Sequence, residues 1–328
     1  MRQITPYEYI KIDIANHFGL DKKLWQERID WTTKNDSKLE SLESGADSPL
    51  LYNKAVRSLR MVQKGEPTNI PVSLDSTWSG GQLMSVLMRC KKTAKASNMI
   101  DTGKRLDIYT VVQNYMNTTF NLSITRQEMK DVLMPRYYSS TKTAKDTFGK
   151  NSNELRAFIA TCEDRLPGAE LCLDVMNTTW NDGALTHNWI RDDGTHVVCP
   201  VMEKEKKRIS IGDTSFTQIA DVNTCKEDGL SNAANFIQSL DGLVMARMVK
   251  MASDQGYELY GVHDSFWCHP LHMQKTRENY LSIMIDLAKK PIMVDWMKQM
   301  TGEDYKELSN KKIQKFVALL ETADYFLS

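Results

Sequence analysis

The sequence predicts an α+β fold that is mainly helical and contains a few short strands. Apolar residues recur at helical spacing through most of the 328 residues, which indicates amphipathic and buried helices. Two β-rich apolar runs, 70–75 and 257–264, each end at an aspartate. The stretch 195–219 instead shows the β-branched alternation that is typical of strands. Together these observations predict helices that surround a small set of strands.

The elements are expected in a definite order along the chain. Lys, Glu, Leu and Trp at helical spacing predict a first helix at 21–43, which residues 44–49 end. Pro135 is expected to bend or end a helix at 126–134, since a proline inside a helix costs about 3 kcal/mol. His263 and Asp264 are expected at the tip of a β-hairpin. The other expected helices are 82–89, 105–116, 154–166, 169–178 and 231–255, and the other expected strands are 196–201, 209–219 and 265–268.

The composition argues against several broad classes of protein. Basic and acidic residues number 42 each, which argues against an overall cationic coat but leaves room for a local basic groove. The six cysteines form no C-x-x-C pair and no cluster with histidine, so neither a zinc site nor a disulfide framework is indicated. No apolar signal segment and no run of about 20 apolar residues occurs. We therefore expect a soluble, cytoplasmic protein without a membrane partner.

Asp75 and Asp264 are the first candidates for chemistry, because each ends an apolar run and opens into a turn. Carboxylates brought together from distant parts of a chain can hold two Mg²⁺ ions about 3.5–4 Å apart, an arrangement that stabilises the entering and leaving oxygens of phosphoryl transfer. Each residue alone also has a simpler interpretation. Asp75 would cap the following helix, and His263-Asp264 would be an ordinary turn.

Arg126, Lys130 and Tyr138 form a second candidate group. Residues four apart share one face of a helix, so Arg126 and Lys130 would lie side by side, with Tyr138 further along near the proline. A guanidinium fork and a mobile ammonium group suit the phosphates of a nucleoside triphosphate, and Lys130 would also protonate the leaving pyrophosphate. The alternative is an exposed basic helix face without a ligand. In the company of the two aspartates, the group suggests a nucleotidyl transferase.

The basic stretch Lys204-Glu-Lys-Lys-Arg208 has two interpretations. The simpler one, which we favour slightly, is a solvated loop. The other is a basic hairpin close to nucleic acid, because Gly212 and Asp213 predict a turn just beyond it.

Three motifs resemble, in order and spacing, those of a known family. They are Asp75-Ser-Thr-Trp-Ser-Gly80-Gly-Gln82, Arg126-x3-Lys130-x3-Met134-x3-Tyr138 and His263-Asp-Ser-Phe266. They are similar to motifs A, B and C of the single-subunit bacteriophage-type RNA polymerases, the T-seven type. Asp107-Ile-Tyr109 and the segment from Asn235 to Gly242 add further matches, and the resemblance runs from about residue 15 to the carboxyl terminus.

The resemblance implies a role for each matching residue. Asp75 and Asp264 would bind two Mg²⁺ ions. Arg126 and Lys130 would bind the triphosphate of the incoming nucleotide, with Tyr138 beside its sugar and base. The reaction would be attack of an RNA 3′-hydroxyl on the α-phosphate, with pyrophosphate leaving. The remaining site residues would be His263 next to the metal-binding aspartate, Tyr109 around the nucleotide pocket, and Gln238 where the family has a histidine that contacts the sugar.

Two positions favour RNA over DNA as the product. Related DNA polymerases carry a glutamate five residues after the motif A aspartate, where its bulk excludes a ribose 2′-hydroxyl, and Gly80 stands here instead. At motif C those enzymes have His-Asp-Glu, whereas this chain has Ser265 in the place of the glutamate. A DNA polymerase of that related family is one alternative, and a non-catalytic nucleic-acid-binding subunit is another.

The resemblance also implies a polymerase hand, in which 1–118 and 232–328 form the palm and 119–231 form inserted fingers. The basic stretch and its hairpin fall where the family has a template-recognition loop. Ser76 and Ser139 replace family glycines and Pro135 is unusual for the family, so the backbone is expected to differ at these positions.

Partners are implied by what lies upstream. Family members carry several hundred residues before motif A, whereas 74 residues precede Asp75 here. Divided polymerases of the N-four phage type carry motifs A, B and C on a larger subunit, which this chain resembles. We therefore expect an obligate heterodimer with a smaller subunit, in the cytoplasm of an infected bacterium. The other expected partners are a DNA template, the RNA product, nucleoside triphosphates and an accessory single-stranded DNA-binding protein.

Overall fold

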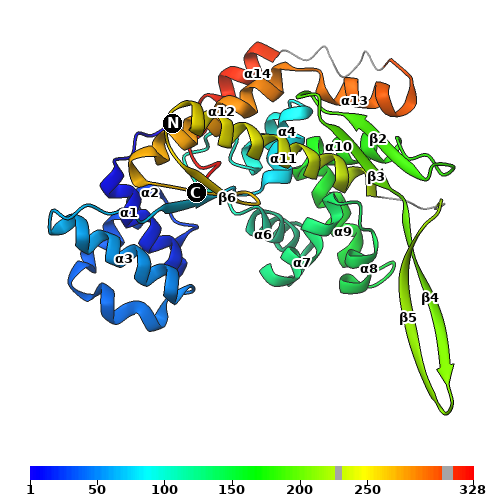
Figure 1. The fold of residues 1–328 in the computed structure, drawn as a ribbon, viewed down its shortest axis with the longest axis horizontal. Coiled ribbons are helices and arrows are strands. Elements are labelled where there is room, and N and C mark those ends of the chain that lie inside the picture. Colours follow the sequence, from blue (N-terminus) through cyan, green and yellow to red (C-terminus); the bar gives the residue numbers. More distant parts are fainter. Residues whose placement is uncertain (226–230, 305–312) are drawn as a thin grey trace.

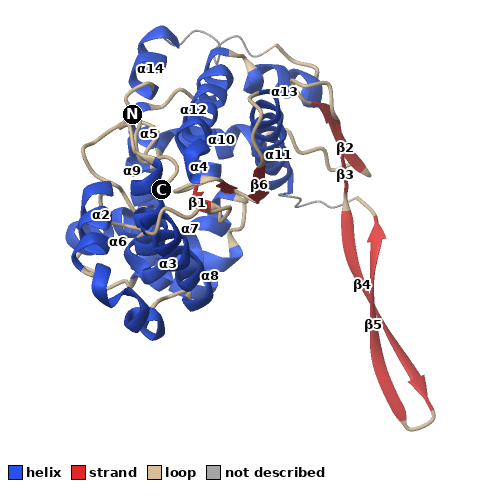
Figure 2. Ribbon diagram, turned by 60° about the vertical axis from the view of Figure 1, so that its left-hand side comes forward, coloured by secondary structure: helices blue, strands red, loops and turns tan. Residues whose placement is uncertain are grey.

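The computed structural model describes residues 1–225, 231–304 and 313–328 and confirms the predicted α+β class. Helices form most of the body, and three small antiparallel sheets occur in the described residues (Figures 1 and 2). None of the described helices is both long and apolar enough to cross a membrane.

The N-terminal part is a group of helices that lies at one end of the molecule (Figure 1). Its first helix starts at a capping box, in which Thr5 accepts from the backbone of Glu8 while the Glu8 side chain accepts from that of Thr5. The predicted single helix at 21–43 is wrong, because the chain leaves helical geometry at Asn35, whose side chain donates to the Trp31 carbonyl at 2.8 Å. The elements are α1 (Pro6–Ala15), a π-helical turn (Asn16–Leu20), α2 (Trp25–Lys34), a 3₁₀ helix (Asp36–Gly45) and α3 (Pro49–Gln63).

A three-stranded antiparallel sheet lies at the centre. It contains β1 (Val72–Asp75), β6 (Leu259–Val262) and β7 (Ser265–Cys268), in the order β1-β7-β6. Both predicted strands are present, with Asp75 at the end of β1 and Asp264 in the turn after β6, and the predicted hairpin between β6 and β7 is confirmed. Because the central strand β7 pairs with both β1 and β6, segments almost 200 residues apart in sequence lie side by side in one sheet.

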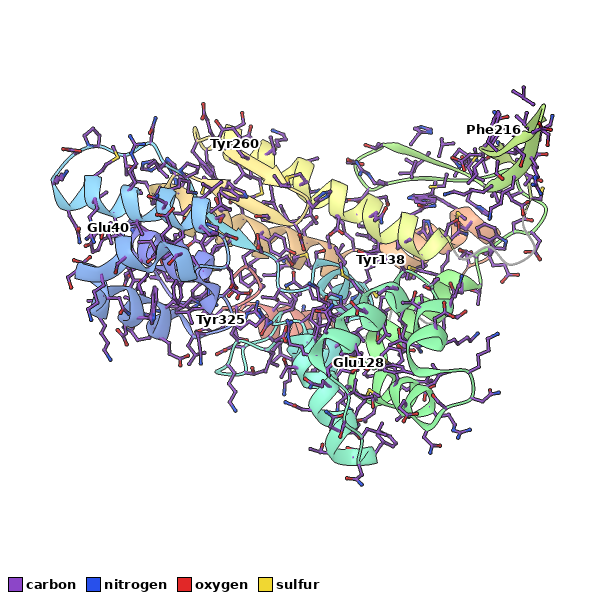
Figure 3. The ribbon with its side chains drawn as sticks, turned by 90° about the horizontal axis from the view of Figure 1, so that it is seen from below. Glu40, Glu128, Tyr138, Phe216, Tyr260 and Tyr325 are labelled. Carbon is purple, nitrogen blue, oxygen red and sulfur yellow. The ribbon has the colours of Figure 1, made fainter. Side chains whose placement is uncertain are left out.

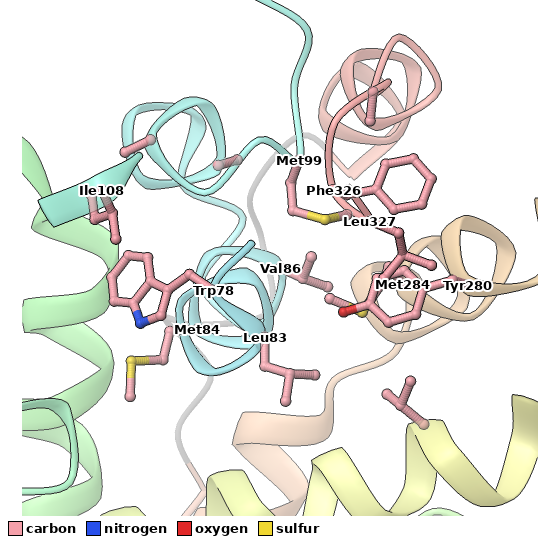
Figure 4. Packing of buried hydrophobic residues seen from close by; sticks show 14 of the residues in the cluster. Trp78, Leu83, Met84, Val86, Met99, Ile108, Tyr280, Met284, Phe326 and Leu327 are labelled. Carbon is pink, nitrogen blue, oxygen red and sulfur yellow. The ribbon is translucent and has the colours of Figure 1, made fainter. Parts of the chain in front are cut away.

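Helix α4 (Ser79–Leu87) lies at the core of this central region, and all but its first residue is buried. It packs against α5 (Lys91–Ala96), α11 (Ser231–Asp254) and α12 (Met273–Lys289). Figure 4 shows Trp78, Leu83, Met84 and Val86 together with the buried side chains of Tyr280, Met284, Phe326 and Leu327. The predicted buried helix near 82–89 and the long helix at 231–255 are confirmed.

The middle of the chain forms a second helical group below this core (Figure 1). Helix α7 continues past Pro135 and ends two residues later, at Tyr137, so the expected end of the helix at the proline falls within its last turn. Proline is tolerated here because only the last turn follows it, and because Arg136 and Tyr137 both bond to Glu170 of a neighbouring helix. The elements are α6 (Ile108–Phe120), α7 (Arg126–Tyr137), α8 (Lys142–Phe148), α9 (Asn153–Arg165) and α10 (Pro167–Asn177).

A long hairpin projects far from the body (Figures 1 and 2). Its strands β4 (Met202–Ile211) and β5 (Thr214–Asn223) are exposed almost throughout, and their turn falls at Gly212 and Asp213 as predicted. The basic stretch 204–208 lies within β4, so the favoured loop interpretation is wrong and the hairpin interpretation of its structure is correct. A shorter hairpin, β2 (Thr186–Ile190) and β3 (His196–Pro200), lies at its base.

The last described helices lie on the opposite side of the core from α6 to α9 (Figure 1). They are α13 (Ile292–Thr301) and α14 (Ile313–Leu320), after a short 3₁₀ turn at Pro270–His272 that precedes α12. The final residues return to the central sheet, where Leu327 bridges Ser76 and the Ser328 backbone N–H donates to the Asp75 carbonyl at 2.8 Å.

Candidate active site

The central sheet brings Asp75 and Asp264 to the same edge. Asp75 is the last residue of β1 and pairs with Ser265, the first residue of β7. The next backbone N–H, that of Ser76, donates to the Asp264 carbonyl at 2.9 Å. Both side chains line one cavity of about 350 Å³. Burial raises the pKa of the Asp264 carboxyl, and the charge of Asp75 raises it further.

This pair of carboxylates suits a hard divalent cation. Within the described ranges no ion pair engages either carboxylate, so their oxygens are not neutralised by a neighbouring cation. The described residues contain no group of three or more potential metal ligands. Mg²⁺ is typically held by one or two carboxylates together with substrate phosphates and water, so the donor set here fits that ion.

Helix α7 supplies the cationic wall of the same cavity. It begins at a capping box between Thr125 and Glu128, and the latter is labelled in Figure 3. Arg126 and Lys130 both line the cavity. Lys130 is exposed and forms no ion pair or hydrogen bond with any described residue, so its ammonium group is available to a ligand.

Arg126 is already engaged. Its Nε and Nη2 donate to the two oxygens of Asp107 at 2.7 and 3.0 Å, and its guanidinium lies 5.4 Å from the centre of the Tyr109 ring. Although burial alone would raise the pKa of Asp107, hydrogen bonds from Arg126 and Thr110 hold that pKa below its usual range. The expected pair of fixed cations is therefore one fixed guanidinium and one mobile ammonium group.

Tyr138 lies where this cavity meets a second one. The second cavity, of about 680 Å³, shares Ser79, Met134, Tyr138 and Asp264 with the first. Tyr138 is the residue that caps α7, and it is half-buried at the centre of the view in Figure 3. The hydroxyl of Tyr109 contacts the Met134 sulfur at 3.6 Å.

The other predicted site residues line the same two cavities. Gly80 is in the wall of the first, and a Cβ atom there would lie 3.6 Å from the Ile237 side chain. Gln238 and His263 are exposed and line the second cavity. His263 is at the β6–β7 turn with φ 56°, a left-handed conformation that is uncommon for residues other than glycine. All nine predicted site residues are thus brought together.

The two serines that replace family glycines behave differently from each other. Ser139 has φ 64°, the conformation that glycine favours, and its hydroxyl contacts Asn177 at 2.8 Å. Ser76 has no positive φ, and its hydroxyl donates to Gln82 at 3.0 Å. The backbone at Ser139 therefore keeps a glycine-like geometry without glycine.

Four lining residues were missed as site residues by the sequence analysis. Lys22 and Arg105 add cations to the first cavity, and Asp107 adds the carboxylate that binds Arg126. Asp241 lies in the second, where burial and then the charge of Asp264 raise its pKa to about 7. Only Asp107 and Asp241 had a sequence signal, through the motifs that contain them. Nothing in the sequence distinguishes Lys22 and Arg105 from other loop residues, and only the fold places them in the wall of the first cavity.

Comparison with known proteins gives the class of this chain. It belongs to the DNA-dependent RNA polymerase family, whose model matches residues 5–148 and 138–324. Among its relatives is the mitochondrial DNA-directed RNA polymerase 1 of Arabidopsis thaliana, with 23% identity over 87% of this chain and 35% of that protein. The chloroplastic DNA-directed RNA polymerase 3 of Nicotiana sylvestris is 20% identical over 88% of this chain and 36% of its own length. The chain thus spans about a third of these relatives.

Proposed function

We propose that this chain is the catalytic part of a DNA-directed RNA polymerase, which adds ribonucleotides to an RNA 3′ end and releases pyrophosphate. One observation carries the proposal. Two carboxylates from strands distant in sequence line a single cavity with the cations of α7, which is the charge arrangement that a metal-bound triphosphate requires. Membership of the polymerase family supports the same activity.

Asp75 and Asp264 would hold two Mg²⁺ ions. When bound, these ions supply charge that offsets the negative charge developing on the entering and leaving oxygens. Lys130 would contact the phosphates and transfer a proton to the leaving pyrophosphate from its ammonium group, which no described partner occupies. Arg126, oriented by Asp107, would present its remaining donors to the same phosphates.

The nucleoside would lie against the second cavity. Tyr138 and Tyr109 would flank its sugar and base, with Gln238 donating to the sugar and His263 beside the metal-binding aspartate. Gly80 would leave room for the ribose 2′-hydroxyl, since no side chain projects from that point of the wall.

The arrangement of the elements supports a hand-like organisation. The central sheet with α4, α11 and α12 would be the palm, formed by 1–118 and 232–328, and the group α7 to α10 would belong to the fingers, formed by 119–231. The projecting β4–β5 hairpin would recognise the template, because its basic side chains are exposed and can reach phosphates.

The resemblance to the divided phage polymerases supports an active form that is an obligate heterodimer with a smaller subunit. Robust elongation of a primed template by the purified chain alone would contradict it. An accessory single-stranded DNA-binding protein, and a location in the cytoplasm of an infected bacterium, remain predictions.

The proposal is tested by the substitution Asp264→Asn in the assembled enzyme, assayed by run-off synthesis on single-stranded template with Mg²⁺. We expect nucleotide addition to fall by at least about 1,000-fold, because one of two metal-binding carboxylates is removed. The complex should remain intact by size-exclusion chromatography. Asp174→Asn, which removes an exposed carboxylate of α10, is the matched control and should retain full activity.

The two alternatives predict other outcomes of the same assay. Unchanged synthesis by the Asp264→Asn enzyme would favour a non-catalytic nucleic-acid-binding subunit. A strong preference of the unaltered enzyme for deoxyribonucleotides over ribonucleotides would favour a DNA polymerase. We expect ribonucleotides to be preferred, since Gly80 has no side chain that would exclude the 2′-hydroxyl.

A further inference from the structure

Arg105 is an arginine in the wall of the first cavity whose donors are almost unused. It lies in the loop before α6 and lines the cavity together with Asp75, Asp264 and Lys130. Across the described part of the chain it forms no ion pair, and its only side-chain hydrogen bond is a long one, from Nη1 to the Leu106 carbonyl at 3.4 Å. Its Nε is buried and has no partner among the described residues. A guanidinium carries five donors, and leaving them desolvated without acceptors is costly.

The other arginines around the core are better satisfied. Arg28 is fully buried and donates to oxygens of Lys23, Asp21, Asn16 and Ser328. Arg136 and Arg126 each form a two-point contact with a carboxylate, Glu170 and Asp107 respectively. In the cavity, therefore, Arg126 is occupied by a protein anion, whereas the fork of Arg105 remains open.

The surroundings of Arg105 also favour an anionic ligand. Four cationic side chains line this cavity, namely Lys22, Arg105, Arg126 and Lys130, together with four carboxylates, of which Asp75 and Asp264 are the proposed metal ligands. Asp107 is already bound to Arg126, and Asp21 contacts its neighbour Lys22 at 3.3 Å. Burial lowers the pKa of Arg105, and the charge of Arg126 lowers it further, although Asp21, Asp107 and Asp75 oppose the shift. An anion with several oxygens would accept hydrogen bonds from the unpaired Arg105 donors and would offset the repulsion between the Arg105 and Arg126 charges.

We propose that Arg105 is a further substrate-binding residue, which donates to phosphate oxygens of the nucleoside triphosphate and of pyrophosphate. The proposal rests on the proposed function, since it assigns the phosphates of that substrate to this cavity. The phosphate chain would then be held from two elements, by Lys130 and Arg126 of α7 and by Arg105 of the loop before α6. A planar fork suits phosphate oxygens better than a lysine does.

The test compares Arg105→Gln and Arg105→Lys with the control Lys104→Gln. Lys104 is the adjacent cation, is exposed and does not line the cavity, so its substitution removes the same charge without the contact. Binding of ATP and of inorganic pyrophosphate to the assembled enzyme is measured by titration calorimetry in Mg²⁺, without any polymerisation. We expect Arg105→Gln to bind both ligands about tenfold more weakly, Arg105→Lys to be intermediate, and Lys104→Gln to match the unaltered chain.

Equal affinities of Arg105→Gln and Lys104→Gln would overturn the inference. If Arg105→Gln fails to fold, judged by thermal unfolding, the unaltered chain is modified with phenylglyoxal and mapped by mass spectrometry. Pyrophosphate should then protect Arg105, and unchanged modification would overturn the inference. If the unaltered assembled enzyme binds neither ligand, the proposed function itself fails. If it binds both and only Lys130→Gln weakens them, the function stands and the role of Arg105 does not.

Discussion

Gly80 and Gly81 are neighbours with opposite tolerance for a side chain. A Cβ at Gly81 would lie 2.1 to 2.3 Å from three ring atoms of Trp78, which is buried and packs on Tyr137. A Cβ at Gly80 would meet only the Ile237 side chain at ordinary contact distance, 3.6 Å. We expect Gly81→Ala to lower the free energy of unfolding by about 1–3 kcal/mol, since overpacking forces the indole to move.

Gly80→Ala is the control for that substitution. It adds the same methyl group one residue earlier in α4 and should be neutral or stabilise by up to about 1 kcal/mol, because alanine is the better helix former. Urea unfolding followed by circular dichroism measures both. Equal stabilities of the two variants would contradict the close approach of Gly81 to Trp78.

The buried carboxyl of Asp241 predicts a pH dependence of stability. Burial, and then the charge of Asp264, raise its pKa to about 7, although Ser79 donates a weak hydrogen bond to it at 3.5 Å. The folded chain therefore holds a proton that the unfolded chain has released between about pH 4 and pH 7, so the free energy of unfolding falls as pH rises through that window.

Asp241→Asn removes this penalty. We expect the variant to gain about 2 kcal/mol over the unaltered chain between pH 4.5 and pH 8, measured by urea unfolding in EDTA. Titrating groups that do not interact with Asp241 are common to both proteins and cancel in the difference. A stability difference that is independent of pH would show that Asp241 is ionised in the folded chain throughout.

Single residues also show what the sequence could and could not predict. Asp75 and Asp264 were recognisable because each ends an apolar run, and in the fold Asp75 ends β1 while Asp264 lies in the turn after β6. Arg105 could not be recognised from the sequence. It stands out because no carboxylate among the described residues pairs with its guanidinium group. Such an absence is a property of three-dimensional packing and has no counterpart in composition or spacing.

At the scale of elements, the last turn of α7 depends on one glutamate of α10. Glu170 accepts from Arg136 at 2.9 and 2.5 Å and from the Tyr137 hydroxyl at 2.8 Å, and all three side chains are at least half-buried. We expect Glu170→Gln to lower the free energy of unfolding by about 2–4 kcal/mol, because it leaves the Arg136 charge without its partner. Glu163→Gln removes an exposed carboxylate of α9 and should change stability by less than about 0.5 kcal/mol.

Because α7 carries Arg126 and Lys130, the same variant should weaken ATP binding as well. Comparable stability of Glu170→Gln and Glu163→Gln would mean that other contacts hold the end of the helix.

The errors of the sequence analysis at this scale have the same cause. Local spacing predicted α11 to within a residue at each end, since a long amphipathic pattern leaves little choice. It failed at 21–43, and it placed the end of α7 two residues early at Pro135, because side chains decide the outcome at both places. Asn35 competes for a backbone carbonyl, and Glu170 holds residues beyond the proline. Tertiary bonds of this kind override helix propensity and cannot be read from a window of sequence.

At the scale of the molecule, the strand order β1-β7-β6 determines the site. Two hairpin-like strands were predictable, but nothing local indicates that β7 pairs with β1 across almost 200 residues. The family resemblance supplied that pairing, because it requires both aspartates in one place. The sequence pattern thus predicted the individual strands, and the family resemblance predicted that Asp75 and Asp264 lie close together.

The β4–β5 hairpin is the part of the molecule that contributes least to the core. Pairing places Lys204, Lys206 and Arg208 on one face, with Asp221 opposite Lys204, and nearly every residue of both strands is exposed. Replacing 204–221 by Asn-Gly would close the hairpin at the Glu203–Val222 pair with a favoured two-residue turn. The free energy of unfolding should change by less than about 0.5 kcal/mol.

Nucleic-acid binding should change instead. Removing a cation that contacts one phosphate reduces the slope of log affinity against log salt by about 0.9, so removing these three cations should reduce it by about 2–3 for duplex DNA. Fluorescence anisotropy from low to moderate salt measures the slope in the assembled enzyme. Lys204→Gln/Lys206→Gln/Arg208→Gln should reproduce the effect of the deletion, whereas Lys207→Gln, on the other face, should have a smaller one. If the deletion leaves the salt slope unchanged, the hairpin does not contact the template through its basic face.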